Sequence, residues 1–155
     1  MTILVMSDSH GRDDYLERIV ETHLNSDLFV FLRDGIRDAE QVFDKYRTVS
    51  SKIVCGNCDW FQNDYSPLSV FTCAGVTVTA CHGHRFGVKS GLGVYAEYAK
   101  SSGASLALFG HTHTECEINY DGVMMFNPGA VCEGSYGIVH IEKGAVLCSH
   151  GRLEI

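Results

Sequence analysis

The sequence predicts an α/β protein in which two mixed β-sheets pack face to face and helices cover their outer sides. In the first part of the chain, short apolar runs alternate with segments of helical periodicity, which is typical of a parallel sheet. From residue 115 onward, short apolar runs are separated by turn dipeptides, which indicates antiparallel strands. A length of 155 residues, of which 45% are hydrophobic, fits one domain with a real core, so we expect residues 1–155 to form a single domain.

Strands are predicted at residues 2–7, 27–32 and 52–55, and a helix is predicted after each of the first two. Either aspartate of the pair at 13 and 14 is expected to cap the first helix. The apolar face expected for that helix consists of Leu16, Ile19, Val20 and Leu24. The apolar face expected for the second helix consists of Ala39, Val42, Phe43 and Tyr46.

The middle of the chain predicts a hairpin, a loop, a helix and a strand. Residues 69–73 and 76–81 form the expected hairpin around Ala74-Gly75, and residues 86–93 are glycine-rich and are expected to be a loop. The helix that follows ends near Gly103, and an apolar strand precedes Gly110. Beyond it, a meander of four strands is predicted at 115–120, 123–127, 136–142 and 145–149.

Composition excludes several classes of function. The net charge of −7 argues against stable nucleic-acid binding and against anionic membranes, which both need a basic surface. No apolar run approaches the roughly 20 residues of a membrane span. The N-terminus has no basic segment typical of a signal peptide, so a cytoplasmic protein is expected. The odd number of cysteines, 7, fits small buried side chains in a reducing compartment.

Metal-binding side chains follow five of the predicted strands. Carboxyl ends of strands are where loops converge on ligands in open α/β sheets. Carboxylate, imidazole and amide donors suit Mn, Fe, Zn, Ni or Co better than a structural cysteine-rich zinc site. Seven donors exceed the needs of one catalytic metal and suit two metals, with Asp34 as the bridge because it stands alone at its strand end. The expected metal ligands are Asp8, His10, Asp34, Asn57, His82, His111 and His113.

Such a centre suits phosphate chemistry. Two dications outweigh the charges of Asp8, Asp34 and a bridging hydroxide, which leaves about +1 to attract a phosphate anion. Metals roughly 3.5–4 Å apart activate a bridging water and clamp the oxygens of an in-line displacement.

The motif set resembles the calcineurin-like metallophosphoesterases, and within them the small bacterial and archaeal phosphodiesterases. The similarity runs from Ile3 to about Gly144. It rests on Asp8-x-His10, Asp34 after a strand, Gly56-Asn57-Cys58-Asp59, His82-Gly83-His84, Gly110-His111-x-His113 and Asn127-Pro128-Gly129.

The resemblance implies a four-layer αββα sandwich and a phosphodiesterase that uses a metal-bridging hydroxide. It implies two divalent cations, with Mn²⁺ first and Zn, Ni, Fe or Co as alternatives, and a small phosphate ester as substrate. It assigns one metal to Asp8, His10, Asp34 and His113. It assigns the other metal to Asp34, Asn57, His82 and His111. Asn57 and His111 are also expected to stabilise charge on the phosphate oxygens.

Two positions depart from the pattern of the wider superfamily. Arg33 replaces the usual glycine before Asp34, and it could bind substrate phosphate, pair with Asp38 or crowd the loop. Cys58 stands where many members carry a histidine that helps to protonate the leaving group. Either His84 takes the role of general acid, or the leaving group departs unassisted.

Three alternatives stay open at this stage. The same site could serve a phosphomonoesterase. The chain could also be a non-catalytic metal-binding scaffold, because a eukaryotic retromer subunit shares the fold that the resemblance implies. In either case the protein could form a homo-oligomer, since relatives of this family often do. Finally, Cys55 and Cys58 form a CxxC pair that could be a redox or zinc site.

Overall fold

The structure is a computed structural model that describes residues 1–55 and 65–154 of the chain. Within these residues the first sheet has the strand order β10-β9-β1-β2-β3. The strands β1, β2 and β3 run parallel, whereas β9 is antiparallel to both of its neighbours. The bounds are β1 Thr2–Met6, β2 Leu28–Phe31, β3 Ser50–Ile53, β9 Ser135–Glu142 and β10 Ala145–Arg152.

The second sheet has the strand order β4-β5-β6-β8-β7 within the described residues. The hairpins β4–β5 and β7–β8 are antiparallel, and β6 runs parallel to β5 on one side and to β8 on the other. The bounds are β4 Leu68–Cys73, β5 Val76–Cys81, β6 Leu106–Leu108, β7 Cys116–Tyr120 and β8 Val123–Asn127.

Three apolar layers hold the sheets and helices together. The strand β1 contributes to two of these layers, because its alternate side chains point to opposite faces of the sheet. Ile3 packs with residues of the second sheet, such as Val78, in the layer between the sheets. Leu4 packs with Leu16 of α1 in the layer between the first sheet and its helices. A third layer lies between the second sheet and α3.

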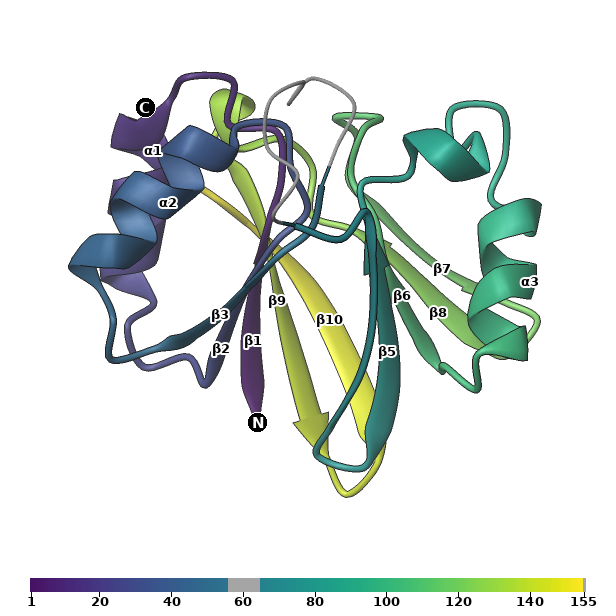
Figure 1. Cartoon of the computed structure of the whole chain (residues 1–155). Helices are drawn as coiled ribbons and strands as arrows, with labels where there is room; N and C mark the ends of the chain where they lie inside the picture. The colour runs from purple at the N-terminus through teal and green to yellow at the C-terminus, as the bar shows by residue number, and fades with distance from the viewer. Residues whose placement is uncertain (56–64, 155) are drawn as a thin grey trace.

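The helices cover the outer faces of both sheets, and Figure 1 shows α1 and α2 beside the first sheet and α3 beside the second. Their bounds are α1 Asp13–Thr22, α2 Ile36–Lys45 and α3 Gly93–Ser101. The predicted α/β architecture of two mixed sheets with helices outside is therefore confirmed. None of the helices in the described part of the chain is both long and apolar enough to span a membrane.

Several local predictions were wrong. The last four strands do not form one meander, because β7–β8 belongs to the second sheet and β9–β10 to the first. The turn signals identify each hairpin but cannot say which sheet it joins. The helix α1 ends at Thr22, so Leu24 lies outside it and is 44% exposed. Its N-cap is Arg12, without a side-chain cap, and Asp13 lies in the first turn.

The predicted hairpin around Ala74-Gly75 is confirmed. The predicted loop at 86–93 is confirmed in part, because a short 3-10 helix, η1 (His84–Phe86), overlaps its start and α3 begins at its end. More important for the site, β1, β2, β5 and β6 point their carboxyl ends toward the same edge of the molecule, at the top of Figure 1.

Candidate metal centre

A first set of metal-binding side chains, here called the enclosed group, consists of Asp8, Asp34 and His82. They follow β1, β2 and β5, and all three are buried. His82 Nε2 lies 3.4 Å from Asp34 Oδ2 and 4.0 Å from Asp8 Oδ1. Two carboxylates and an imidazole thus converge from both sheets on one small volume.

The orientation of the His82 ring is fixed by the backbone. His82 Nδ1 lies 2.9 Å from the carbonyl oxygen of Leu32, which can only accept, so Nδ1 carries the proton. A neutral ring then presents the lone pair of Nε2 to the two carboxylates. Burial by itself lowers the pKa of His82, but the Asp34 and Asp8 carboxylates outweigh burial and raise this pKa. Either a proton or a cation therefore belongs at Nε2.

A second set, here called the open group, consists of Asp8, His10 and His113. His113 Nε2 lies 3.2 Å from Asp8 Oδ1, and His10 Nε2 lies 3.7 Å from the same oxygen. The two imidazole nitrogens face each other at 3.2 Å. The side chains of His10 and His113 are 38% and 36% exposed, so this group borders solvent.

Asp8 belongs to both groups, and its two oxygens differ. Oδ2 accepts hydrogen bonds from Ser7 Oγ at 2.5 Å and from the His111 backbone N–H at 3.1 Å. Oδ1 is buried and makes no hydrogen bond with the described residues. An anionic oxygen buried in this way is costly unless a cation compensates it.

The donor set fits divalent cations. Donor atoms that share a metal at about 2.1 Å lie roughly 3–3.5 Å from one another. The 3.2 Å separation of His10 Nε2 and His113 Nε2 falls in that range, as does the 3.2 Å separation of His113 Nε2 and Asp8 Oδ1. Carboxylate and imidazole donors are those that manganese, iron and zinc accept.

Two further histidine rings stand beside the enclosed group. His111 Nδ1 lies 3.1 Å from His82 Nε2, and the His84 ring centre lies 5.6 Å from that of His82. Burial and the charge of His82 lower the pKa of His111 to about 4, which keeps the ring neutral and leaves the lone pair of one ring nitrogen available. Burial, His82 and Arg85 likewise lower the pKa of His84.

The loops reach this convergence through unusual backbone conformations. Left-handed φ values occur at Asp8 (57°), His10 (47°), His111 (68°) and His113 (59°). Such conformations cost a side-chain-bearing residue roughly 1–2 kcal/mol and cluster at functional sites. These strained residues lie in two loops, the one that follows β1 and the one that follows β6, which is consistent with loops that bind a ligand.

Some supporting residues were missed by the sequence analysis. The Asn127 amide nitrogen donates to Gly110 O at 3.1 Å and to Thr112 Oγ1 at 2.9 Å, which holds the loop that carries His111 and His113. The sequence analysis used the motif Asn127-Pro128-Gly129 for the family resemblance but gave Asn127 no role. A Cβ at Gly110 would lie 2.0 Å from Ser7 Oγ, so this position requires glycine. Nothing in the sequence pattern identifies Ser7.

The structure narrows the options for Arg33. Its side chain is completely buried, which argues against direct contact with substrate. Burial lowers its pKa, whereas Cys55, Asp34 and Glu40 raise it, so its guanidinium lies beside these three groups. Asp38, the partner considered for Arg33, accepts hydrogen bonds from Ser9 Oγ and the Gly11 N–H.

The predicted ligands come together only in part. Asp34 belongs to the enclosed group alone, and Asp8 is the residue that the two groups share. His111 belongs to neither group but touches His82. The remaining predictions, on Asn57 and Cys58, lie outside the described residues. The bridging role of Asp34 and the assignment of ligands to each metal stay predictions.

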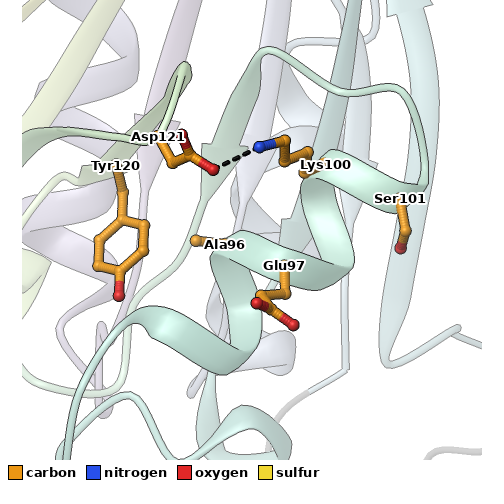
Figure 2. Close-up of a pocket in the computed structure, with 6 residues that line it drawn as sticks. All are labelled: Ala96, Glu97, Lys100, Ser101, Tyr120 and Asp121. Atoms are coloured by element: carbon orange, nitrogen blue, oxygen red, sulfur yellow. Dashed lines mark hydrogen bonds and ion pairs between the residues drawn. The ribbon is translucent and has the colours of Figure 1, made fainter.

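A hollow of about 310 Å³ lies elsewhere, between α3 and the β7–β8 turn (Figure 2). Lys100 and Asp121 form an ion pair at this hollow, and the side chain of Tyr120 lines it. It sits at the amino end of β8, whereas the metal-binding side chains follow the carboxyl ends of the parallel strands. The hollow is therefore separate from both donor groups.

Comparison with known proteins agrees with this fold. The chain is 29% identical over 153 residues to the probable metallophosphoesterase YsnB of Bacillus subtilis (strain 168), a match that covers 94% of this chain and 87% of that protein. An archaeal phosphodiesterase has a similar fold, with a TM-score of 0.75, 20% identity and coverage of 97% and 99%. Zinc-bound Vps29 of Entamoeba histolytica gives a TM-score of 0.74, 18% identity and coverage of 98% and 99%.

A family model provides the assignment. The model of the calcineurin-like phosphoesterase superfamily domain matches residues 1–144, which is most of the chain. This match contains both donor groups, since their members lie between Asp8 and His113. The resemblance inferred from the motifs is confirmed, and the chain belongs to the calcineurin-like phosphoesterase superfamily.

Proposed function

We propose that this protein is a dinuclear metal-dependent phosphoesterase that hydrolyses phosphodiesters. The observation that carries the proposal is the position of Asp8 in two donor groups, one enclosed and one open. Two cations that share one carboxylate are the arrangement that two-metal hydrolysis uses. The archaeal phosphodiesterase of similar fold supports the choice of diesters.

Bound divalent cations would supply Lewis-acid activation of water and neutralise charge on the phosphoryl oxygens. We assign them to Asp8, His10, Asp34, His82, His111 and His113, together with Asn57. We propose manganese as the first choice. Zinc, nickel, iron and cobalt are alternatives, because carboxylate and imidazole donors bind all of these metals.

The chain's own residues would bind and orient the substrate. The water oxygen bonds to phosphorus as the bond from phosphorus to the leaving alcohol breaks, and a proton ends on the leaving oxygen. We propose that His111, neutral and partly buried beside His82, contacts a phosphoryl oxygen. We propose the same role for Asn57.

The donor of that proton is a separate question. His84 stands beside His82 and His111, but its lowered pKa favours the neutral ring. An anionic phosphate nearby would raise this pKa and make the ring a better acid. If His84 is the general acid, His84→Ala will slow a diester with a poor leaving group far more than one with 4-nitrophenolate. Equal rates for variant and wild type on the poor leaving group would mean unassisted departure.

The test of the proposed function is hydrolysis of bis(4-nitrophenyl) phosphate by metal-stripped protein, with and without Mn²⁺, beside 4-nitrophenyl phosphate. We expect diester turnover that requires Mn²⁺ and is lost in His111→Ala. The matched control is His140→Ala, because His140 bonds Thr2 at the opposite end of β1 and should retain activity.

The other outcomes separate the alternatives. A preference for the monoester would keep the site and change the class to phosphomonoesterase. Failure to bind Mn²⁺ or Zn²⁺ by calorimetry would contradict the dinuclear proposal. Binding of metal without turnover of either ester would favour the non-catalytic metal-binding scaffold.

A further inference from the structure

His150 joins the two sheets at the edge of the molecule that carries the metal centre. It lies near the end of β10, where it pairs with Gly137 of β9, and β10 runs in the same direction as β1. Its ring stacks on Phe126 of β8 in the second sheet, with ring centres 4.7 Å apart. A Cβ at Gly137 would lie 2.4 Å from Phe126 Cε1, so the glycine leaves room for this ring. The His150 ring therefore has a defined position where the two sheets meet.

The same ring also holds the backbone at the end of β8. His150 Nε2 lies 2.8 Å from the carbonyl oxygen of Asn127. A carbonyl oxygen can only accept, so Nε2 carries the proton and donates it. His150 thus contacts two consecutive residues of β8, Phe126 through the plane of its ring and Asn127 through its N–H.

Asn127 connects this contact to the loop that follows β6. Its side chain is completely buried. Its amide nitrogen donates to Gly110 O at 3.1 Å and to Thr112 Oγ1 at 2.9 Å, and these two residues flank His111. Its amide oxygen accepts a hydrogen bond from the Gly129 N–H at 2.9 Å. Any displacement of the Asn127 backbone therefore moves the side chain that holds the loop on both sides of His111.

This loop depends on support from outside. His111 and His113 both have left-handed φ values, 68° and 59°. Such a backbone persists only where the surrounding structure fixes it. A metal ligand also has to be held within a fraction of an ångström of its productive position. Contacts that fix this loop should therefore affect metal binding although they do not touch the metal.

We infer that His150 is a positioning residue for the metal centre. Through Asn127, it holds the loop of His111 and His113 in the conformation that binds the cation of the open group. The inference rests on the proposed function, because it gives His150 a role in the dinuclear centre. His150 lies beyond residues 1–144, which the family model matches, so this role is not part of the family pattern.

Two variants separate the hydrogen bond of His150 from its ring packing. His150→Phe keeps an aromatic ring against Phe126 and removes the donor. His150→Gln removes the ring but can place an amide N–H near the position of Nε2. We expect His150→Phe to weaken Mn²⁺ binding at the open group by about three- to tenfold, which is the contribution of one hydrogen bond. His150→Gln should restore most of this affinity, and calorimetric titration with Mn²⁺ measures both.

His23→Phe is the matched control. His23 is another half-buried histidine whose ring contacts an aromatic ring, that of Tyr136 at 4.9 Å, but it lies at the C-terminal end of α1. This variant should keep the wild-type affinity for Mn²⁺. Thermal unfolding of the metal-free variants checks that they fold. Wild-type affinity in His150→Phe, or an equal loss in His150→Phe and His150→Gln, would overturn the inference.

A measurement on the metal-free protein separates this inference from the proposed function. The His111 N–H donates to Asp8 Oδ2 at 3.1 Å, and the Thr112 N–H donates to Gly110 O at 2.8 Å. We expect hydrogen exchange at both amides to be about three- to tenfold faster in His150→Phe and close to wild type in His150→Gln. If the wild type binds no Mn²⁺, the proposed function fails, but this pattern of exchange still supports the positioning role. Unchanged exchange at both amides in His150→Phe would reject that role whatever the metal affinity.

Discussion

The enclosed and open groups share Asp8 but differ in how the protein holds the rest of each group. In the enclosed group, His82 is wholly buried and its ring is fixed by the Leu32 carbonyl oxygen. In the open group, His10 and His113 are more than one-third exposed and face each other. Ligands that are oriented in advance bind a metal with less loss of conformational freedom.

This difference teaches that two metals at one centre need not be equivalent. Fixed, buried donors favour tight binding and slow exchange, whereas donors at the solvent border favour weaker binding. We therefore expect one cation to bind strongly at the enclosed group and a second to bind more weakly at the open group. The following variants test this comparison.

The largest effect is expected where the two groups meet. Asp8→Asn removes the shared charge while it keeps the shape of the side chain. Because loss of a supporting contact already costs about 10–100-fold in metal affinity, we expect loss of this ligand to exceed 100-fold at both groups. Calorimetric titration with Mn²⁺ measures this, and the Mn²⁺-dependent rise in unfolding temperature should disappear.

Asp44→Asn is the matched control for this variant. Asp44 is an exposed carboxylate that pairs with Arg47, so its loss should leave Mn²⁺ affinity unchanged. If Asp8→Asn retained one tight site, Asp8 would not be a common ligand, and the idea of a shared carboxylate would fail.

A smaller effect is expected when each group is changed separately. His82→Ala should weaken the tight Mn²⁺ site and, through it, the unfolding temperature of the loaded protein. His10→Ala should remove only the weaker binding event, by about 10–100-fold in affinity. Titration of both variants, followed by the rate of Mn²⁺ loss to a chelator, measures the two events. The comparison would be wrong if His10→Ala weakened the tighter event and His82→Ala the weaker one.

Sequence reasoning found the chemistry of this centre better than its geometry. The ends of strands identified Asp8, His82 and His113, because the alternation of apolar runs shows where strands stop and carboxyl ends of strands converge. It proposed Asp34 as the bridge, which stays a prediction, and it could not show that Asp8 takes part in both donor groups, because sequence does not reveal that Asp8 lies between the loops of both sheets. That position depends on left-handed backbone at Asp8, which no periodicity reveals.

The fold shows the same limit. The continuous apolar run of β1 predicted a buried strand, and the structure explains this run by two different apolar layers on its two faces. The two hairpins after residue 115 were recognised from Asp121-Gly122 and Lys143-Gly144. Their placement in different sheets depends on tertiary packing, since β9 pairs with β1 at the other end of the chain.

The smallest effect is expected at Arg33, which lies beside a member of the enclosed group but not beside the open group. Its buried positive charge lies beside Asp34 of the enclosed group. A fixed cation next to a ligand carboxylate opposes the binding of a dication, although Glu40 offsets part of this charge. Arg33→Met keeps most of the side-chain volume and removes the charge.

We expect Arg33→Met to raise Mn²⁺ affinity at the enclosed group by about three- to tenfold and to change the open group less, because Coulomb interactions weaken with distance. Arg33→Lys is the control, since it keeps the positive charge and should stay close to the wild type. Calorimetry measures both affinities, and thermal unfolding of the metal-free variants checks the fold. A lower affinity in Arg33→Met, with normal stability, would mean that the guanidinium orients Asp34 rather than opposing the metal. In that case the arginine before Asp34 would be a positioning residue, and the enclosed group would owe its order to both Leu32 and Arg33.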